Sequence, residues 1–558
     1  MKTKLIITAL FVLAGVAYSC TDLSETVRDT ALGQEVLEQP DAPEQTLAPV
    51  YAGMQNLMAS HNWLNNLQSI SSYEQITPFR GGTDWFDGGR FIEMHEHTWA
   101  PSHVSVIDVW GGATQGVARA AIAERNIQDL GGGADLAAEA RGLKAVYNYW
   151  LLDLFNVSFD KKGEDIGTNN LSIVYRDTEA VDYILSEIEQ IEDQLPSVNE
   201  VGETRLTRAA VIGLKARLLL NKAIYANRYA APESQTFEAS DMQSVIEFTT
   251  EIINSGDYSL ETEDYFNMFG LENEGHPELI FAFEQNESTG GYGSMAWFQS
   301  SRNRHRTPAN PGAVGSDGSA MTQEFYDLWE GFRDDPRFFT RNIPDGGSVP
   351  DEEFAWNRGI QIGQQYGIEF VDGSQSQFKR DENGDLLIVP LTDFARSGEP
   401  MVYTREIGIT TDSGHLAGAR SLKWDLDPTT VNRGDSNINM PWLRLGEVYL
   451  MRAEAYARTG NWGQALNDIN TLRAARGARQ LQATELDAFD ELEREWYFEM
   501  YHEHWTRTIQ IRFGNWEETW RDKTSTEEYR RVFPIPQEAI DLAQSEPCLL
   551  YTSPSPRD

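Results

Sequence analysis

The chain has 558 residues, 40% of them hydrophobic, and a formal net charge of −40 at pH 7. An acidic excess of this size, dispersed along the chain, excludes a nucleic-acid-binding protein, because phosphate contacts require a basic surface. Only two cysteines are present, at positions 20 and 548, so zinc-type cysteine pairs and redox motifs are excluded and the fold must be held by core burial.

The N-terminus has the pattern of an export signal. Two lysines precede an apolar run of about twelve residues, Leu5–Val16, which is too short for a permanent membrane span. Small residues then lead to Cys20. We therefore expect residues 1–19 to be a lipoprotein signal peptide and Cys20 to be lipidated, which would anchor the protein to a membrane. Because a leucine is commoner three residues before such a cysteine than Ala17, the alternative is an ordinary secreted protein cleaved after Ala17 or Ser19.

A polar, acidic segment over residues 20–45 is expected to be a flexible tether, and residues 46–547 are expected to form one domain. Helices are predicted at 45–60, 103–130, 135–156, 178–195, 205–228, 240–255, 440–477 and 484–511. Between 258 and 440 the chain is rich in Gly, Asn and Asp, with short strand-like runs at Glu278–Phe283 and Leu386–Val389. The predicted fold class is mostly α, a helical scaffold with a long loop-rich region that carries short strands.

Two windows concentrate aromatic residues among glycines, and in the first the glycines make a helix unexpected. Residues 79–90 hold Trp85 and Phe86 between glycine pairs, and residues 287–306 hold a tyrosine, a tryptophan and a phenylalanine. Aromatic faces stack on the C–H faces of sugar rings, and neighbouring Asp, Asn and Arg side chains hydrogen-bond the hydroxyls. These loops are the predicted carbohydrate-binding surface. The alternative is that their tryptophans cap loops from the core. Trp356 lies in a third such loop.

Three groups of residues were weighed for metal or catalytic chemistry. The three histidines between His95 and His103 lack the spacing of a metalloprotease helix, so no metal is assigned. Residues 381–385 resemble the opening of a calcium loop without its final glutamate, and a turn between two strands is preferred. Asp84 and Asp87 could form a glycosidase pair, but carboxylates are abundant in this chain. We therefore expect no enzyme, no cofactor and no metal.

The segment from Trp442 to Arg512 has the strongest helical pattern. Tyr449, Ala453 and Tyr456 fall on one helical face, and Gly460 ends that helix directly before the next one begins. Small residues at such positions let two antiparallel helices approach closely. The pattern predicts a helical hairpin of tetratricopeptide (TPR) type.

The C-terminal residues 548–558, CLLYTSPSPRD, look like one reading frame of a sequencing adapter. A genuine Ser/Pro-rich tail is the alternative. We assign no function to anything after Pro547.

Several segments together resemble the SusD/RagB family and occur in that family's order. They are AEARGLKAVYNYWLLDLF (138–155), TRLTRAAVIGLKARLLLNKAIY (204–225), RLGEVYLMRAEAYARTG (444–460), EREWYFEMYHEHW (493–505) and the closing FPIP (533–536). The resemblance covers most of the chain.

This resemblance implies a non-catalytic glycan-binding lipoprotein on the outer-membrane surface. Its partners would be an oligosaccharide or polysaccharide and a SusC-type TonB-dependent transporter, to which it would deliver the glycan. By the same resemblance, ligands would be held by loops in the two aromatic windows, at Asp84, Trp85, Tyr292 and Trp297. The alternatives are a peptide-binding subunit of a similar importer and a surface glycosidase.

Overall fold

The computed structural model describes residues 39–542 apart from 82–83, 167, 169, 286–293, 301–306, 308–314, 373, 375, 394–396, 410–413, 428 and 430–435. The predicted signal peptide, Cys20, most of the predicted tether and the tail from residue 548 lie outside the described residues. None of the helices in the described part is both long and apolar enough to cross a bilayer.

The helices are α3 (Ala42–Gln45), α4 (Ala48–Ala59), α5 (Arg90–His95), α6 (Val104–Asp129), α7 (Ala134–Phe155), α8 (Asp177–Glu189), α9 (Val198–Val201), α10 (Arg208–Ala226), α11 (Ala239–Asn254), α12 (Ser294–Gln299), α13 (Gln323–Asp327), α14 (Leu445–Arg458), α15 (Trp462–Ala475), α16 (Phe489–Met500), α17 (Thr506–Phe513) and α18 (Gln537–Leu542). The strands are β1 (Gln75–Ile76), β2 (Ser158–Asp160), β3 (Ile173–Tyr175), β4 (Leu279–Phe283), β5 (Ala320–Met321), β6 (Phe339–Thr340), β7 (Gly347–Val349), β8 (Arg358–Gln361), β9 (Gly363–Gln364), β10 (Tyr366–Ile368), β11 (Leu386–Pro390), β12 (Val402–Tyr403), β13 (Arg420–Leu422) and β14 (Met440–Arg444).

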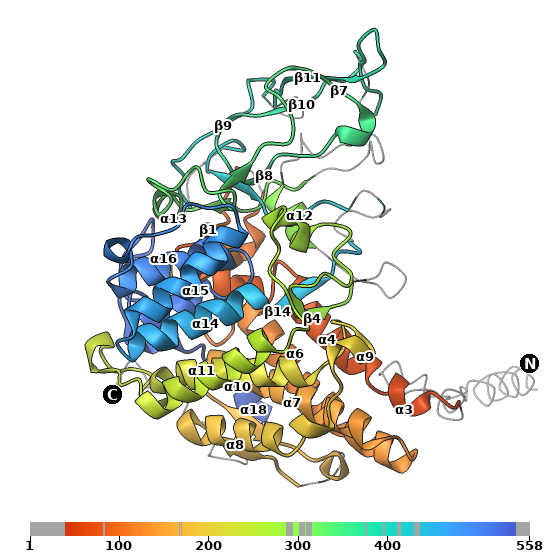
Figure 1. Ribbon diagram of the computed structural model, residues 1–558, viewed down its shortest axis with the longest axis vertical. Coiled ribbons are helices and arrows are strands. Elements are labelled where there is room, and N and C mark those ends of the chain that lie inside the picture. The colour runs from red at the N-terminus through yellow and green to blue at the C-terminus, as the bar shows by residue number, and fades with distance from the viewer. Residues whose placement is uncertain are drawn as a thin grey trace, which may run out of the picture.

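The long helices form a scaffold of neighbouring pairs. Helix α6 packs along α7, α10 along α11, and α14 along both α11 and α15, so helices from the two halves of the chain lie side by side (Figure 1). Gly460, at φ +79°, separates α14 from α15 in the left-handed conformation that glycine adopts without strain. The mostly α-helical, TPR-containing fold predicted from the sequence is confirmed.

The helix predicted over 484–511 is instead two helices, α16 and α17, separated by residues 501–505. His502 and His504 interrupt the helix at φ of 59° and 65°. Both side chains are buried, and the ring Nε2 of His504 lies 3.0 Å from the Met58 carbonyl oxygen. The periodicity of the segment did not show this interruption, because the contact that accompanies it comes from the other end of the chain.

The loop-rich region leaves and rejoins the helical scaffold at one pair of strands. Strand β4 pairs antiparallel with β14, and all residues of both strands are buried. The two strand-like runs predicted in this region are β4 and β11. Between β4 and β14 the chain forms small sheets, including β13–β8–β6 and β10–β11–β7, at the upper end of the molecule in Figure 1. The predicted loop-rich region is therefore a separate β-rich layer on the helical scaffold.

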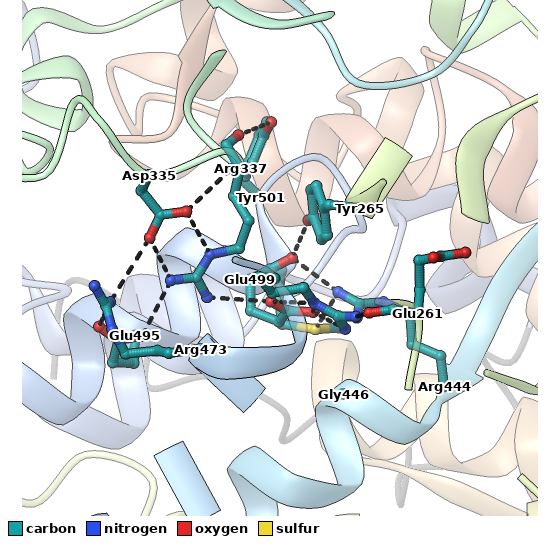
Figure 2. A network of polar contacts seen from close by, with 12 residues as sticks. Glu261, Tyr265, Asp335, Arg337, Arg444, Gly446, Arg473, Glu495, Glu499 and Tyr501 are labelled. Atoms are coloured by element: carbon teal, nitrogen blue, oxygen red, sulfur yellow. Dashed lines mark hydrogen bonds and ion pairs between the residues drawn. The ribbon is translucent and has the colours of Figure 1, made fainter. Parts of the chain in front are cut away.

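A buried network of charged side chains connects that layer to the C-terminal helices. Its members are Glu278, Asp335, Arg337, Lys423, Arg444, Arg473, Arg476, Glu495, Glu499 and Glu503, whose side chains are at most 1% exposed. Glu499 lies at its centre (Figure 2) and pairs with Arg337, Arg444 and Arg476 at 3.2, 2.5 and 2.6 Å. Because five cations balance five anions, the charges are compensated without solvent.

Candidate functional site

The first aromatic window is a tight loop that depends on left-handed backbone. Gly88 and Gly89 have φ of 68° and 93°, and Trp85 itself is at 59°. Few residues other than glycine adopt this conformation readily, and it interrupts a regular helix. The prediction that no regular helix crosses the centre of this window is therefore confirmed. The turns bury the Trp85 side chain, which is only 9% exposed.

The two windows meet at Trp85 and Trp297. Their ring centroids lie 5.8 Å apart, and Phe298 of the same helix, α12, contacts Trp85 edge-to-face at 5.1 Å. The Trp85 indole Nε1 donates to the carbonyl oxygen of Ser316 at 2.9 Å. Trp85 therefore forms a fixed wall of the site, and the expectation that it is presented on the surface is corrected. Trp297 keeps part of its surface exposed.

His61 completes the aromatic cluster from the N-terminal helical segment. Its imidazole stacks on Phe298 at 4.7 Å and lies 5.7 Å from Trp297. Burial, together with the nearby Arg90, lowers the pKa of His61 to about 3. The ring is therefore neutral at physiological pH and packs as an aromatic group. Sequence analysis did not single out His61, because the residues with which it stacks are more than 200 positions away.

Polar and exposed groups lie around this cluster. The Asp84 carboxylate Oδ2 is 3.7 Å from His415 Nδ1, and both side chains are partly exposed. Phe86 is 46% exposed and rests edge-to-face on Phe79 at 5.8 Å. Arg80, which is buried, donates to the carbonyl oxygens of Gly414 and Ala417 and so ties this loop to the 414–418 segment. Phe86 is thus the surface-presented ring of the first window.

The remaining sequence candidates have different environments. Tyr292 lies outside the described residues. Trp356 is 5% exposed and belongs to a small hydrophobic cluster with Ile368 and Leu386 in the β-rich layer. Asp381 forms a turn next to β11, accepting from the backbone N–H groups of Asn383 and Asp385 at 2.8 and 3.1 Å, as the preferred interpretation of this segment predicted.

The three histidines of the 95–103 segment are engaged separately. Ring nitrogens of His95, His97 and His103 lie 2.6, 2.6 and 3.0 Å from the carbonyl oxygens of Arg521, Ser71 and Arg90, respectively. Among the described residues no group of three His, Cys, Asp or Glu side chains could hold a metal ion. These histidines fix backbone segments and do not converge on one point.

The helical scaffold thus carries two aromatic windows, far apart in the sequence, that meet in one cluster. Comparison with known proteins defines the class further. Residues 402–524 match the model of the SusD family. The starch-binding protein SusD of Bacteroides thetaiotaomicron is 26% identical over 437 residues, which cover 72% of this chain and 70% of that protein.

Solved structures agree with the sequence matches. A SusD homolog from Bacteroides thetaiotaomicron superposes with a TM-score of 0.64 at 17% identity, covering 92% of this chain and 98% of that one. A laminarin-binding SusD-like protein superposes with a TM-score of 0.63 at 17% identity, covering 89% and 96%. The resemblance to the SusD/RagB family is therefore confirmed, and the chain has the SusD-like fold.

Proposed function

We propose that this protein is a non-catalytic, cell-surface glycan-binding subunit that delivers an oligosaccharide or polysaccharide to a SusC-type TonB-dependent transporter in the outer membrane. Its relatives support a glycan as the ligand, since one is named a starch-binding protein and another a laminarin-binding protein. The observation that carries the proposal is the meeting of Trp85 and Trp297, from windows about 200 residues apart, at 5.8 Å.

The geometry suggests how a glycan would be held. Trp297 and Phe86 supply partly exposed rings for stacking on sugar C–H faces, and Trp85 positions Trp297 from behind. Asp84 and His415 lie beside them and offer hydrogen-bonding groups for hydroxyls. Of the four predicted contacts, Asp84, Tyr292 and Trp297 remain proposed ligand contacts and Phe86 is added, while Trp85 is proposed to support them from within the cluster. Binding of this kind requires no cofactor and no bond cleavage.

Affinity electrophoresis against a panel of neutral and acidic polysaccharides tests this function. We expect one glycan to retard the protein and Trp297→Ala or Phe86→Ala to weaken that binding about tenfold, because an aromatic contact in a binding site is commonly worth more than 1 kcal/mol. Phe489→Ala, which removes an exposed phenylalanine from α16, is the matched control and should bind like the wild type. Retardation by no glycan, or accumulation of cleaved product, would contradict the proposal.

The transporter partnership has a separate test. The gene for a SusC-type transporter should lie directly beside the gene for this protein, because the two subunits would act together. Co-purification of the transporter with the tagged protein from outer membranes should show the pair directly. If the protein is recovered alone from an intact locus, the import-complex proposal is wrong while glycan binding stands.

A further inference from the structure

A cavity of about 590 Å³ opens in the β-rich layer, and its lining residues are distinct from the Trp85–Trp297 cluster. Its apolar lining includes Leu271, Phe354 and Leu426, and its polar lining includes Asn342, Arg358 and Asp425. A volume of this size lies within the range of pockets that bind small ligands, about 300–1,000 Å³. A mixture of an aromatic ring with a few fixed polar groups suits an amphipathic ligand such as a sugar.

The Phe354 ring in the cavity wall is supported by a buried tryptophan. Phe354 is partly exposed, and its ring meets the buried Trp356 edge-to-face at 5.0 Å with an interplanar angle of 81°. The Asn342 amide Nδ2 donates to the Trp356 carbonyl oxygen at 2.7 Å. Phe354 thus presents a ring whose support is rigid, so little conformational entropy would be lost on stacking.

The polar part is equally fixed. The Arg358 guanidinium donates to the carbonyl oxygens of Leu422 and Lys423 at 3.2 and 2.5 Å and to Asp425 Oδ2 at 2.9 Å. Asp425 also accepts from the Leu426 backbone N–H at 2.8 Å, and about a third of its side chain remains exposed. Among the residues that the structure describes, Asn342 Oδ1 accepts no hydrogen bond. Acceptors of this kind are available to sugar hydroxyls.

The charges around the cavity select against anionic ligands. Asp351, Glu352 and Asp425 line it, and the lining cation, Arg358, is already paired with Asp425. Asp351 is likewise paired, with Arg380 outside the lining, so three carboxylates face two cations that are already engaged. A uronic acid or sulfated sugar would meet this net negative charge, whereas a neutral sugar would not.

The cavity and the Trp85–Trp297 cluster lie on connected elements. Arg358 begins β8, which pairs with β13, and β13 contacts α12, the helix of Trp297. In Figure 1, β8 and α12 both lie near the junction of the helical scaffold and the β-rich layer. A sugar chain that extends from the Trp85–Trp297 cluster would therefore reach the cavity through elements that contact one another.

We propose that this cavity, with Phe354, Asn342 and Asp425 as its contacts, is a second carbohydrate site that binds a more distant segment of a long, neutral glycan. The inference rests on the proposed function, because it extends the glycan already assigned to the Trp85–Trp297 site. It predicts that both sites bind the same glycan molecule and that the length of the glycan determines whether the second site is occupied.

Calorimetric titration of the full-length protein carrying Cys20→Ser, with short and long oligosaccharides cut from the neutral polysaccharide that retards it, tests the inference. We expect Phe354→Ala to weaken binding of long chains about tenfold and of short chains less than twofold. Phe354→Tyr, which keeps the ring, should bind like the wild type, and so should the control Phe489→Ala. Trp297→Ala should weaken binding of both lengths. A uronic acid polymer should show no binding that depends on Phe354.

Hydrogen–deuterium exchange gives a readout that does not depend on the variant folding. Long neutral chains should protect residues 342–358 of the otherwise wild-type protein, and short chains should not. If long chains bind but Phe354→Ala changes nothing and these residues gain no protection, the second site is wrong and the proposed function stands. If the wild type binds no glycan of either length, both are wrong.

Discussion

At the scale of single residues, Glu493 is a buried carboxylic acid that lies outside the charged network. It lines a cavity of about 260 Å³ between α16 and the segment around Trp520. Its carboxylate accepts hydrogen bonds from the Tyr497 hydroxyl and from Asn515 Nδ2, and it forms no ion pair within the described part of the chain. Burial raises the pKa of Glu493 to about 8 despite these donors, and the nearby Asp490 contributes in the same direction. Glu493 is therefore protonated at neutral pH.

The consequence is a defined pH dependence of stability. Because the folded protein holds the proton more tightly than the unfolded chain, the free energy of unfolding should fall as pH rises from about 4.5 to about 8. Glu493→Gln mimics the protonated form and should remove this contribution, so its stability relative to the wild type should increase by about 4 kcal/mol between pH 5 and pH 9. Urea denaturation at several pH values measures the difference. The exposed Glu538→Gln is the control, and a flat difference for Glu493→Gln would contradict the assignment.

Glu499 illustrates the opposite electrostatic situation. Burial alone would raise its pKa, but Arg476, Arg444 and Arg337 hold the pKa of Glu499 well below its usual range. If this carboxylate were neutralised, the buried network would hold one positive charge more than its anions compensate.

Glu499→Gln should therefore destabilise the fold by about 3–5 kcal/mol, the usual cost of breaking a buried ion pair. Asp345→Asn breaks an ion pair with Arg341 in which the Arg341 side chain is 52% exposed and the Asp345 side chain 53%. This change should cost less than about 1 kcal/mol. Thermal unfolding of both variants tests the contrast. Equal losses would show that the buried network is not what connects the β-rich layer to the helices.

At the scale of elements, helices α4, α6 and α7 approach closely because glycines leave room for Tyr147. The Tyr147 hydroxyl donates to the Val50 carbonyl oxygen at 2.7 Å. A Cβ atom on Gly53 would lie 2.5 Å from that hydroxyl, and one on Gly116 would lie 2.0 Å from the ring. The three helices thus pack closely because Tyr147 occupies the space that the missing side chains of Gly53 and Gly116 leave open.

Two glycines of the same helix give a matched test of this packing. Gly116→Ala should destabilise the protein by about 1–3 kcal/mol, because the added methyl group must displace a buried ring. Gly111→Ala, where nothing lies within 4 Å of the added carbon, should instead stabilise it by about 0.5–1 kcal/mol through helix propensity alone. Denaturation midpoints should move in opposite directions. A shift of the same sign in both would exclude the steric explanation.

At the scale of the whole molecule, the two strands β4 and β14 place the loop-rich region on the helical scaffold as one unit. Many of the chain's cations are buried inside that scaffold in ion pairs, while the chain as a whole carries −40 charges. Because buried anions accompany these cations, the acidic excess lies on the exposed surface. Such a surface favours neutral over anionic glycans and repels anionic polymers except within about a Debye length of a local cation.

Anchoring is the prediction that belongs to this scale. If Cys20 is the lipidated N-terminus of the mature protein, Cys20→Ser should move the protein from the membrane fraction to the soluble fraction. Glycan affinity should not change, because residue 20 lies far along the chain from both proposed sites. Membrane fractionation followed by immunoblotting measures the distribution. Retention of the variant in membranes would place the anchor elsewhere.

Local patterns in the sequence determined the helices, the TPR-type hairpin, the strand-like runs and the resemblance to the SusD/RagB family, since each depends on residues only a few positions apart. They also located both aromatic windows. Tertiary structure alone decided that Trp85 turns inward while Phe86 faces outward, that His61 joins the cluster, and that α16 ends before His502. It likewise paired Glu499 with its arginines and left Glu493 with none. These outcomes depend on contacts between residues tens to hundreds of positions apart, where burial and packing override local preference.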